Sequence, residues 1–167
     1  MTDARRPEGE SRRPKGESYV RGAETPPLRE ETIPGLLAAA VAAHGPREAA
    51  VFSSQGLRLT WTELSAAVDR LATGLLDLGV GPGDRVGIWA PNRPEWLLTQ
   101  FAAARIGAIL VNVNPAYRVG ELEYALAKVG CKALVLADAF KSSDYLGMIR
   151  RLAPELETAT PGALRAE

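Results

Sequence analysis

The stretch GDRVGIWAPNRPEW, residues Gly83–Trp96, decides the fold because it joins an apolar strand to a helix through a polar corner. Its Arg85–Ala90 part is a short apolar run without alternation, which is typical of a strand buried on both faces. Pro94 suits the first position of a helix, where an N–H has no partner to lose, and Glu95 suits the positive end of the helix dipole. The corner is therefore predicted to start a helix at Pro94.

Two functions are open for this corner, because loops at the carboxyl ends of such strands often hold ligands. As a plain turn, it needs only Asn92, whose side chain is expected to hydrogen-bond the backbone ahead of it. As a ligand loop, it presents free N–H groups at the helix start, and Arg93 adds a charge-assisted contact. The local chemistry favours the plain turn.

Two further strand–helix units follow. Apolar runs predict strands at Ala108–Val113 and Ala133–Ala137, each followed by a helix. Short buried strands that alternate with helices form parallel sheets with helices on both faces, so we predict an α/β, doubly wound, mainly parallel fold. The predicted helices of the three units span Pro94–Ile106, Gly120–Val129 and Ala139–Leu152.

The residues before this sheet are predicted to form a helix, a β-hairpin and a second helix. Pro34 and the stop at Gly45–Pro46 delimit the first helix, with His44 as a structural residue in its last turn. Thr60 and Glu63 have the spacing of a capping box before a longer apolar helix. The hairpin strands are Ala49–Ser54 and Leu57–Trp61, and the second helix ends at Gly79.

Composition removes several classes of function. The 167 residues carry 20 basic and 20 acidic side chains, so no global field favours nucleic acid or an anionic membrane. Cys131 and His44 are single residues of their type, which excludes an internal disulfide and a Cys/His metal cluster, and His44 is expected to be structural and not catalytic. No apolar run approaches the roughly 20 residues of a membrane span. The start has no apolar signal region, so we expect a cytoplasmic protein.

Three regions are expected along the chain. Residues 1–31 are rich in Arg, Glu, Pro and Gly and are predicted to be a disordered tail. Residues 32–157 are expected to form part of one domain, and residues 158–167 a truncated extension. No strand follows Pro154 to cover the last helix, so we expect a partial domain, in which an exposed sheet edge favours self-association.

For other segments, a purely structural interpretation stands beside a functional one. The glycines of Gly79–Gly87 precede a strand, so they indicate a turn and not a phosphate loop. Cys131 is expected to pack as a small apolar group. The loop Asn112–Arg118 offers two asparagines, a tyrosine and an arginine after a strand, and either a ligand site or a simple turn at Asn114–Pro115 accounts for it.

Three segments together resemble the opening of adenylate-forming enzymes, a superfamily that includes acyl-CoA synthetases. They are LTWTEL (Leu59–Leu64), GDRVGIWAPNRPEW (Gly83–Trp96) and AARIGAILVNVNPAYRVGELEYAL (Ala103–Leu126). The segments NPAYRVGELEYALAKVGCKAL, TPGAL (Thr160–Leu164) and SYVRG (Ser18–Gly22) resemble the medium-chain acyl-CoA synthetase branch in particular.

The resemblance implies an N-terminal part of an enzyme that joins a fatty acid to coenzyme A, using ATP and Mg²⁺, through an acyl-adenylate. The family's phosphate loop, nucleotide-binding motifs and terminal lysine have no counterpart in this chain, so no catalytic residue and no metal ligand is assigned. The fragment is expected to be inactive and to bind none of these cofactors tightly. Positions matching the family's coenzyme A contacts are Asn114, Pro115, Ala116 and Lys141, although Lys141 also fits a solvated lysine at a helix start.

A non-enzymatic alternative stays open at this point. The chain would then be a remnant or a binding module for a coenzyme A-like ligand or a protein partner. The DNA downstream of codon 167 separates the two, because a continuing frame with a phosphate loop indicates an enzyme.

Overall fold

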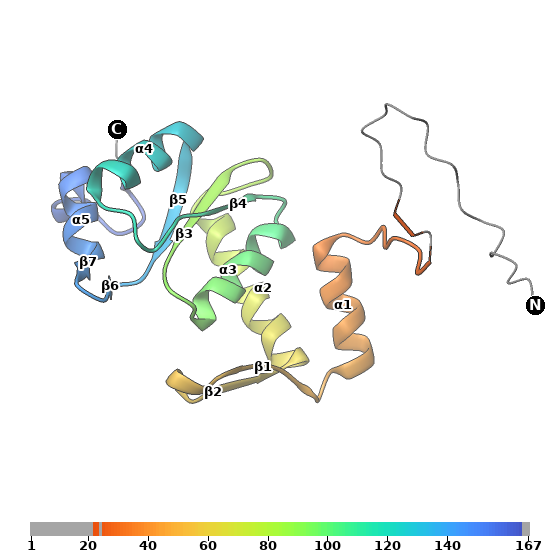
Figure 1. Ribbon diagram of the computed structural model, residues 1–167. Helices are drawn as coiled ribbons and strands as arrows, with labels where there is room; N and C mark the ends of the chain where they lie inside the picture. Colours follow the sequence, from red (N-terminus) through yellow and green to blue (C-terminus); the bar gives the residue numbers. More distant parts are fainter. Residues whose placement is uncertain (1–21, 24, 165–167) are drawn as a thin grey trace, which may run out of the picture. The chain divides into compact units, whose positions relative to one another are not determined.

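The computed structural model describes residues 22–23 and 25–164, and the chain divides into two units, 1–30 and 31–167. Among the described residues, helices and strands occur only in the second unit (Figure 1). Most of the tail predicted for residues 1–31 lies outside the described residues, as do most of the SYVRG segment and the last three residues of the predicted extension.

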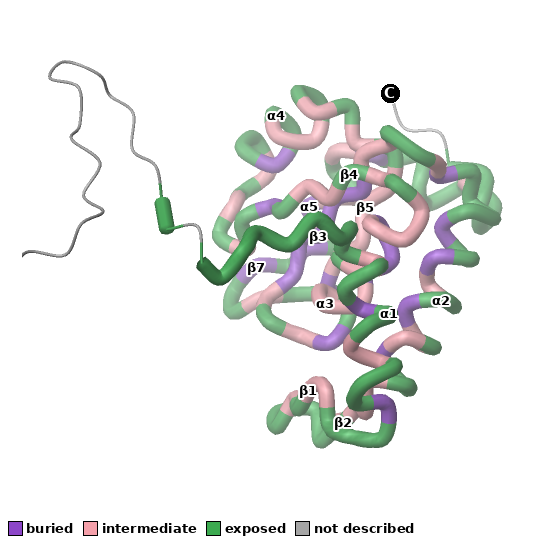
Figure 2. The backbone as a smooth tube through the Cα atoms, turned by 90° about the vertical axis from the view of Figure 1, so that its right-hand side faces the viewer, coloured by how far each residue is buried: buried purple, intermediate pink, exposed green. Residues whose placement is uncertain are grey.

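A three-stranded parallel sheet forms the centre of the second unit, with β3 between β4 and β5. The β3 residues Val86, Ile88 and Trp89 are fully buried, and most of β3 has the colour of buried residues in Figure 2. Helices α2 and α3 cover one face, while α4 and α5 cover the other (Figure 1), so the predicted α/β fold with a parallel sheet is confirmed. The elements are β3 (Arg85–Trp89), β4 (Ile109–Asn112), β5 (Cys131–Leu136), α2 (Trp61–Asp77), α3 (Pro94–Arg105), α4 (Val119–Val129) and α5 (Tyr145–Leu152).

The segments before the sheet also form as predicted. A capping box starts α2: the Thr60 hydroxyl accepts from the Glu63 N–H at 3.2 Å, and the Glu63 carboxylate accepts from the Thr60 N–H at 2.8 Å. These bonds lower the pKa of Glu63, because they stabilise its charged form. Before it lie α1 (Ile33–His44) and an antiparallel hairpin of β1 (Glu48–Phe52) and β2 (Leu57–Thr60), joined by the short 3₁₀ helix η1 (Ser53–Gln55).

The prediction of a continuous helix over Ala139–Leu152 is wrong. Residues 139–144 form a small hairpin of β6 (Ala139–Phe140) and β7 (Ser143–Asp144), and α5 begins only at Tyr145. Lys141 stands in the turn with a φ of 52°, a conformation that no α-helix continues through. Asp144 then caps α5 by accepting from the Gly147 N–H at 2.9 Å. A second 3₁₀ helix, η2 (Pro154–Glu157), follows α5.

The glycine-rich segment before β3 is a turn, as predicted. Gly79 ends the α2 region with a φ of 80°, and the Val80 N–H donates back to Leu75 at 2.9 Å. Asp84 closes the turn, because its carboxylate accepts from the Lys132 ammonium at 2.7 Å and from the Gly81 N–H at 2.8 Å. Both bonds lower the pKa of Asp84, with the Lys132 bond as the larger cause.

The lowered pKa of Asp84 predicts a pH-dependent stability. A carboxyl group with a depressed folded pKa stabilises the fold above its ordinary value of 3.8 and loses this contribution as the pH falls through the folded pKa. Asp84→Asn is therefore expected to have a lower melting temperature than the wild type at about pH 6. This difference in melting temperature should shrink below about pH 3. Asp77→Asn is the control, because its side chain has no hydrogen-bond partner among residues 22–23 and 25–164. A difference that is independent of pH would contradict the assignment.

Gly87 has no room for a side chain, because a Cβ there would lie 2.8 Å from Leu134 Cδ1 and 3.0 Å from Cys131 Sγ. Cys131 fills this space as a half-buried thiol, and its burial raises its pKa, in agreement with the predicted packing role.

Gly87→Ala is expected to lower the free energy of unfolding by about 1–3 kcal/mol through overpacking. Gly74→Ala is the matched control in α2, where a Cβ meets nothing within 4 Å, and it is expected to stabilise by about 0.5–1 kcal/mol. Urea denaturation measures both. Equal changes in the free energy of unfolding of the two variants would show that close packing at Gly87 does not limit stability.

Candidate functional site

The carboxyl ends of the parallel strands bring two loops together. After β4, the Val113 N–H donates to the carbonyl oxygen of Ile88 at 3.0 Å. After β5, the Ala137 N–H donates to the carbonyl oxygen of Trp89 at 3.1 Å. Both loops therefore start as continuations of the sheet, on either side of the end of β3. This is the edge at which open α/β sheets bind ligands.

Two buried aromatic residues hold the loop after β4. The rings of Trp89 and Tyr145 stack with their centroids 3.6 Å apart and an interplanar angle of 9°, and neither residue is exposed. The Trp89 indole N–H donates to the carbonyl oxygen of Asn114 at 3.0 Å, and the Tyr145 hydroxyl donates to that of Pro115 at 2.6 Å. We call these two residues the aromatic pair. It ties β3 and α5 to successive carbonyl groups of one loop.

The phenol of the aromatic pair stays a hydrogen-bond donor. Burial raises the pKa of Tyr145 above its usual 10.0, because a buried phenolate loses its hydration. The hydroxyl therefore keeps the proton that it donates to Pro115. The Tyr145 backbone N–H donates to the carbonyl oxygen of Asp138 at 3.1 Å, which connects the start of α5 to the end of β5.

Three of the four predicted coenzyme A residues lie in this held loop. The Asn114 side-chain oxygen accepts from the Ala116 N–H at 2.9 Å, which forms the turn expected at Asn114–Pro115. The side chains of Asn114 and Ala116 are exposed, whereas Pro115 is half-buried. The Asn114 amide nitrogen has no hydrogen-bond partner within the described part of the chain, so it is available to a ligand.

The fourth predicted residue, Lys141, lies on the neighbouring β6–β7 hairpin. Its ammonium group is 5.3 Å from the centre of the Phe140 ring, and the residue is exposed. Of the alternative, a solvated lysine at a helix start, only the position is wrong: Lys141 is exposed, but it stands in a hairpin turn with positive φ. The charge is still presented at the carboxyl edge of the sheet, where it follows β5.

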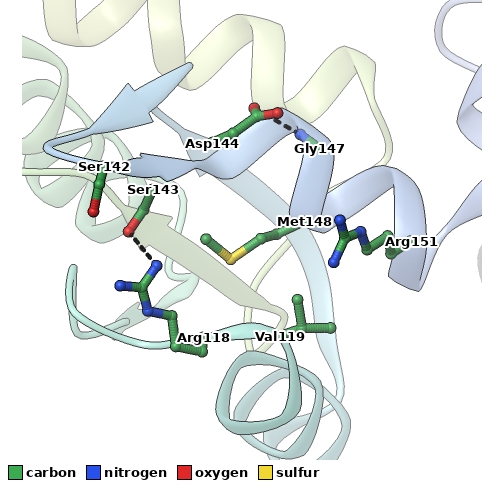
Figure 3. Close-up of a pocket in the computed structure, with 8 residues that line it drawn as sticks. All are labelled: Arg118, Val119, Ser142, Ser143, Asp144, Gly147, Met148 and Arg151. Carbon is green, nitrogen blue, oxygen red and sulfur yellow. Dashed lines mark hydrogen bonds between the residues drawn. The ribbon is translucent and has the colours of Figure 1, made fainter.

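A pocket of about 240 Å³ lies between the starts of α4 and α5. Figure 3 shows that the guanidinium group of Arg118 points to Ser143, with an Nη1 to Oγ distance of 3.0 Å, while the Arg151 side chain extends toward Met148. Sequence reasoning included Arg118 among the polar groups of the loop but missed the other residues. The polar run between β5 and α5 was the available signal. The lining residues are Arg118, Val119, Ser142, Ser143, Asp144, Gly147, Met148 and Arg151.

The APNRPEW corner has the geometry of a turn. Pro94 is buried at the first position of α3, as predicted. Arg93 donates to the Glu95 carboxylate at 2.7 Å, so its charge is compensated within the corner. The expected side-chain turn at Asn92 is wrong, because no hydrogen bond of the Asn92 side chain occurs among the described residues. Backbone geometry and the buried proline make the corner without it.

The described residues contain neither a metal-ligating cluster nor a helix that could span a membrane. No group of three or more His, Cys, Asp or Glu side chains within residues 22–23 and 25–164 is arranged to hold a metal ion. Within the same ranges, every helix is too short or too polar to cross a membrane.

Comparisons with known proteins identify the family and the fold of the chain. The sequence pattern of AMP-binding enzymes matches residues 37–164. The chain is 47% identical over 149 residues to the medium-chain acyl-CoA ligase ACSF2, mitochondrial, of Danio rerio, covering 89% of this chain and 25% of the relative. It is 45% identical over 150 residues to the protein of the same name from Homo sapiens, covering 90% and 24%. The N-terminal domain of FACL13 from Mycobacterium tuberculosis superposes with a TM-score of 0.68 at 25% identity, covering 80% and 32%.

These similarities define the class as acyl-CoA synthetases, whose N-terminal fold the chain shares in part. The chain belongs to the AMP-binding enzyme family. The predicted resemblance is thereby confirmed. The chain spans about a quarter of the length of the curated relatives it matches.

Tyr145→Phe tests the aromatic pair, because it removes only the hydroxyl and keeps the ring stack. We expect a loss of about 1 kcal/mol in the free energy of unfolding, the usual value of one buried hydrogen bond. Tyr124→Phe is the matched control: Tyr124 is exposed, its hydroxyl accepts from Lys128 at 2.7 Å, and its removal should change stability by less than about 0.5 kcal/mol. The pair would lose its assigned role if Tyr145→Phe were as neutral as Tyr124→Phe in thermal or urea unfolding.

Proposed function

We propose that this chain is part of an AMP-forming acyl-CoA ligase that acts on a fatty acid or another carboxylic acid. The observation that carries the proposal is the held loop at the carboxyl edge of the sheet, in a chain that is 47% identical to a medium-chain acyl-CoA ligase. The complete enzyme would activate the acid with ATP and Mg²⁺ as an acyl-adenylate, release pyrophosphate, and transfer the acyl group to the thiol of coenzyme A. Activation supplies the leaving group that a free carboxylate lacks.

The contribution of this chain to that reaction would be to position coenzyme A. The exposed Asn114 amide has donors to offer, and Lys141 has an ammonium group without a carboxylate partner in the described part of the chain. Both groups fit a ligand that carries phosphates. The Pro115 carbonyl is engaged by Tyr145, so Pro115 and Ala116 would contribute shape and not charge. Orientation of one reactant is a large part of catalysis in a two-substrate reaction.

No residue of this chain is proposed to act on the reacting atoms. We therefore expect the purified chain 1–167, given ATP, Mg²⁺, a medium-chain fatty acid and coenzyme A, to form neither AMP nor acyl-CoA above an enzyme-free blank. Chromatography of nucleotides and thioesters measures both products. Either product above the blank would show that the chain holds catalytic groups of its own.

The coenzyme A contact predicts a specific effect at Lys141. Lys141→Ala should weaken the binding of coenzyme A to the chain by about two- to fivefold, the range for one exposed ion pair, in a titration followed by NMR at low ionic strength. Lys128→Ala is a matched control, because Lys128 is also exposed and lies 5.0 Å from the centre of an aromatic ring, that of Tyr124. Equal weakening by the two changes would remove Lys141 from the contact.

The cytoplasmic location stays a prediction. The relatives of Danio rerio and Homo sapiens carry the word mitochondrial in their names, so organelle fractionation with an antibody to the chain is the direct test.

A further inference from the structure

The pocket between α4 and α5 is lined by two arginines, Arg118 and Arg151. Neither Arg118 nor Arg151 has a carboxylate within 4.0 Å in the described part of the chain. The Arg118 backbone N–H donates to the Glu121 carboxylate at 2.8 Å. Its guanidinium group uses one N–H for Ser143, and the other guanidinium N–H groups have no acceptor among residues 22–23 and 25–164. The guanidinium groups therefore keep most of their donors available to a ligand. Guanidinium donors suit phosphate oxygens, because their planar fork can bind two of them.

The acidic residue of the pocket is already engaged. Asp144 accepts from the Gly147 N–H at 2.9 Å and so caps α5, and Figure 3 shows its carboxylate turned toward Gly147. It makes no ion pair with either pocket arginine. The pocket thus has two cationic side chains and one acidic side chain, and the acidic one accepts a hydrogen bond from Gly147. The net charge of the lining side chains is positive.

The helix start does not supply the donors of this pocket. The N–H groups of Tyr145 and Leu146 both donate to the carbonyl oxygen of Asp138, at 3.1 and 3.3 Å. The next N–H, that of Gly147, donates to Asp144. Since the first turn of α5 is satisfied within the protein, an anion in this pocket would not bind the N–H groups of that turn.

Ser143 adds a buried hydroxyl with an unused proton. It is only 7% exposed and lines the pocket, where its oxygen accepts from Arg118. No acceptor for the hydroxyl proton occurs among the described residues. A buried donor without an acceptor is costly, and an anion in the pocket would remove this cost.

From these four observations we propose that Arg118, Ser143 and Arg151 form a binding site for a phosphate group. The two arginines supply charge from the residue before α4 and from α5, and Ser143 supplies a hydroxyl donor. Met148 and Val119 give the pocket an apolar side, which suits a phosphate that is carried by a larger organic molecule. The volume of about 240 Å³ is several times the roughly 30 Å³ of one water molecule, so a phosphate has room.

The site goes beyond the coenzyme A contact proposed above, because none of its three residues belongs to that contact. The phosphate has two sources that share this chemistry: the phosphates of coenzyme A, or a free or differently carried phosphate. The test separates the two.

The experiment is a titration of the ¹⁵N-labelled chain with inorganic phosphate, dephospho-coenzyme A and coenzyme A, in which the Ser143 and Gly147 amide resonances report binding. Arg151→Gln and Arg118→Gln are each expected to weaken phosphate binding about fivefold or more, and Ser143→Ala about threefold. Arg150→Gln is the matched control, because Arg150 precedes Arg151 on α5 and does not line the pocket. It should leave the affinity within about twofold.

The results of this titration test the phosphate site and identify the source of the phosphate. The proposal is overturned if none of the three probes shifts these amides, or if Arg150→Gln weakens binding as much as Arg151→Gln does. Ser143→Ala keeps every charge, so an unchanged affinity in that variant would remove the hydroxyl from the site even if an arginine variant failed to fold. Tighter binding of coenzyme A than of both other probes assigns its 3′-phosphate to the pocket. Equal affinity for coenzyme A and phosphate keeps the site and contradicts the coenzyme A contact at Asn114 and Lys141.

Discussion

The indole ring of Trp89 stacks on the phenol ring of Tyr145, and each side chain donates a hydrogen bond to a carbonyl group of the same loop. The position of the loop after β4, at the carboxyl edge of the sheet, depends on this aromatic pair. Trp89 ends the central strand and Tyr145 starts α5, so the stack connects both layers to the loop after β4. Both side chains are fully buried and the two hydrogen bonds to the loop are part-buried, so both bonds are partly shielded from water.

A held backbone is what a positioning loop requires. The chain shares the fold of acyl-CoA synthetases, in which the main physical task is to orient charged reactants and exclude water. On the edge described here, rigid backbone carries exposed side chains: Asn114 and Ala116 on one loop and Lys141 on the hairpin. The basic pocket lies beside these groups, bounded by Arg118 and α5. In the proposed function, the residues that stabilise this edge and the residues that would bind the ligand are therefore neighbours.

Much of this fold could be predicted from local sequence signals. The apolar run of β3, the proline at the start of α3 and the capping box at Thr60 each act within a few residues, and the structure contains all three. The β6–β7 hairpin was missed because two-residue strands have no periodicity, and Asp144 was not recognised as a helix cap. The aromatic pair and the pocket were missed for another reason. Their residues are far apart in the chain and meet only through tertiary packing.

The most direct test of the account is hydrogen exchange of the indole N–H groups of the three tryptophans, followed by NMR. The Trp89 indole is buried and hydrogen-bonded to Asn114, whereas Trp61 and Trp96 are half-buried and their indoles have no hydrogen-bond acceptor among the described residues. The account predicts one indole N–H, that of Trp89, protected as strongly as the amides of β3. If all three indole N–H groups exchanged at the rate of free indole, the aromatic pair would not hold the loop, and the central claim would be contradicted.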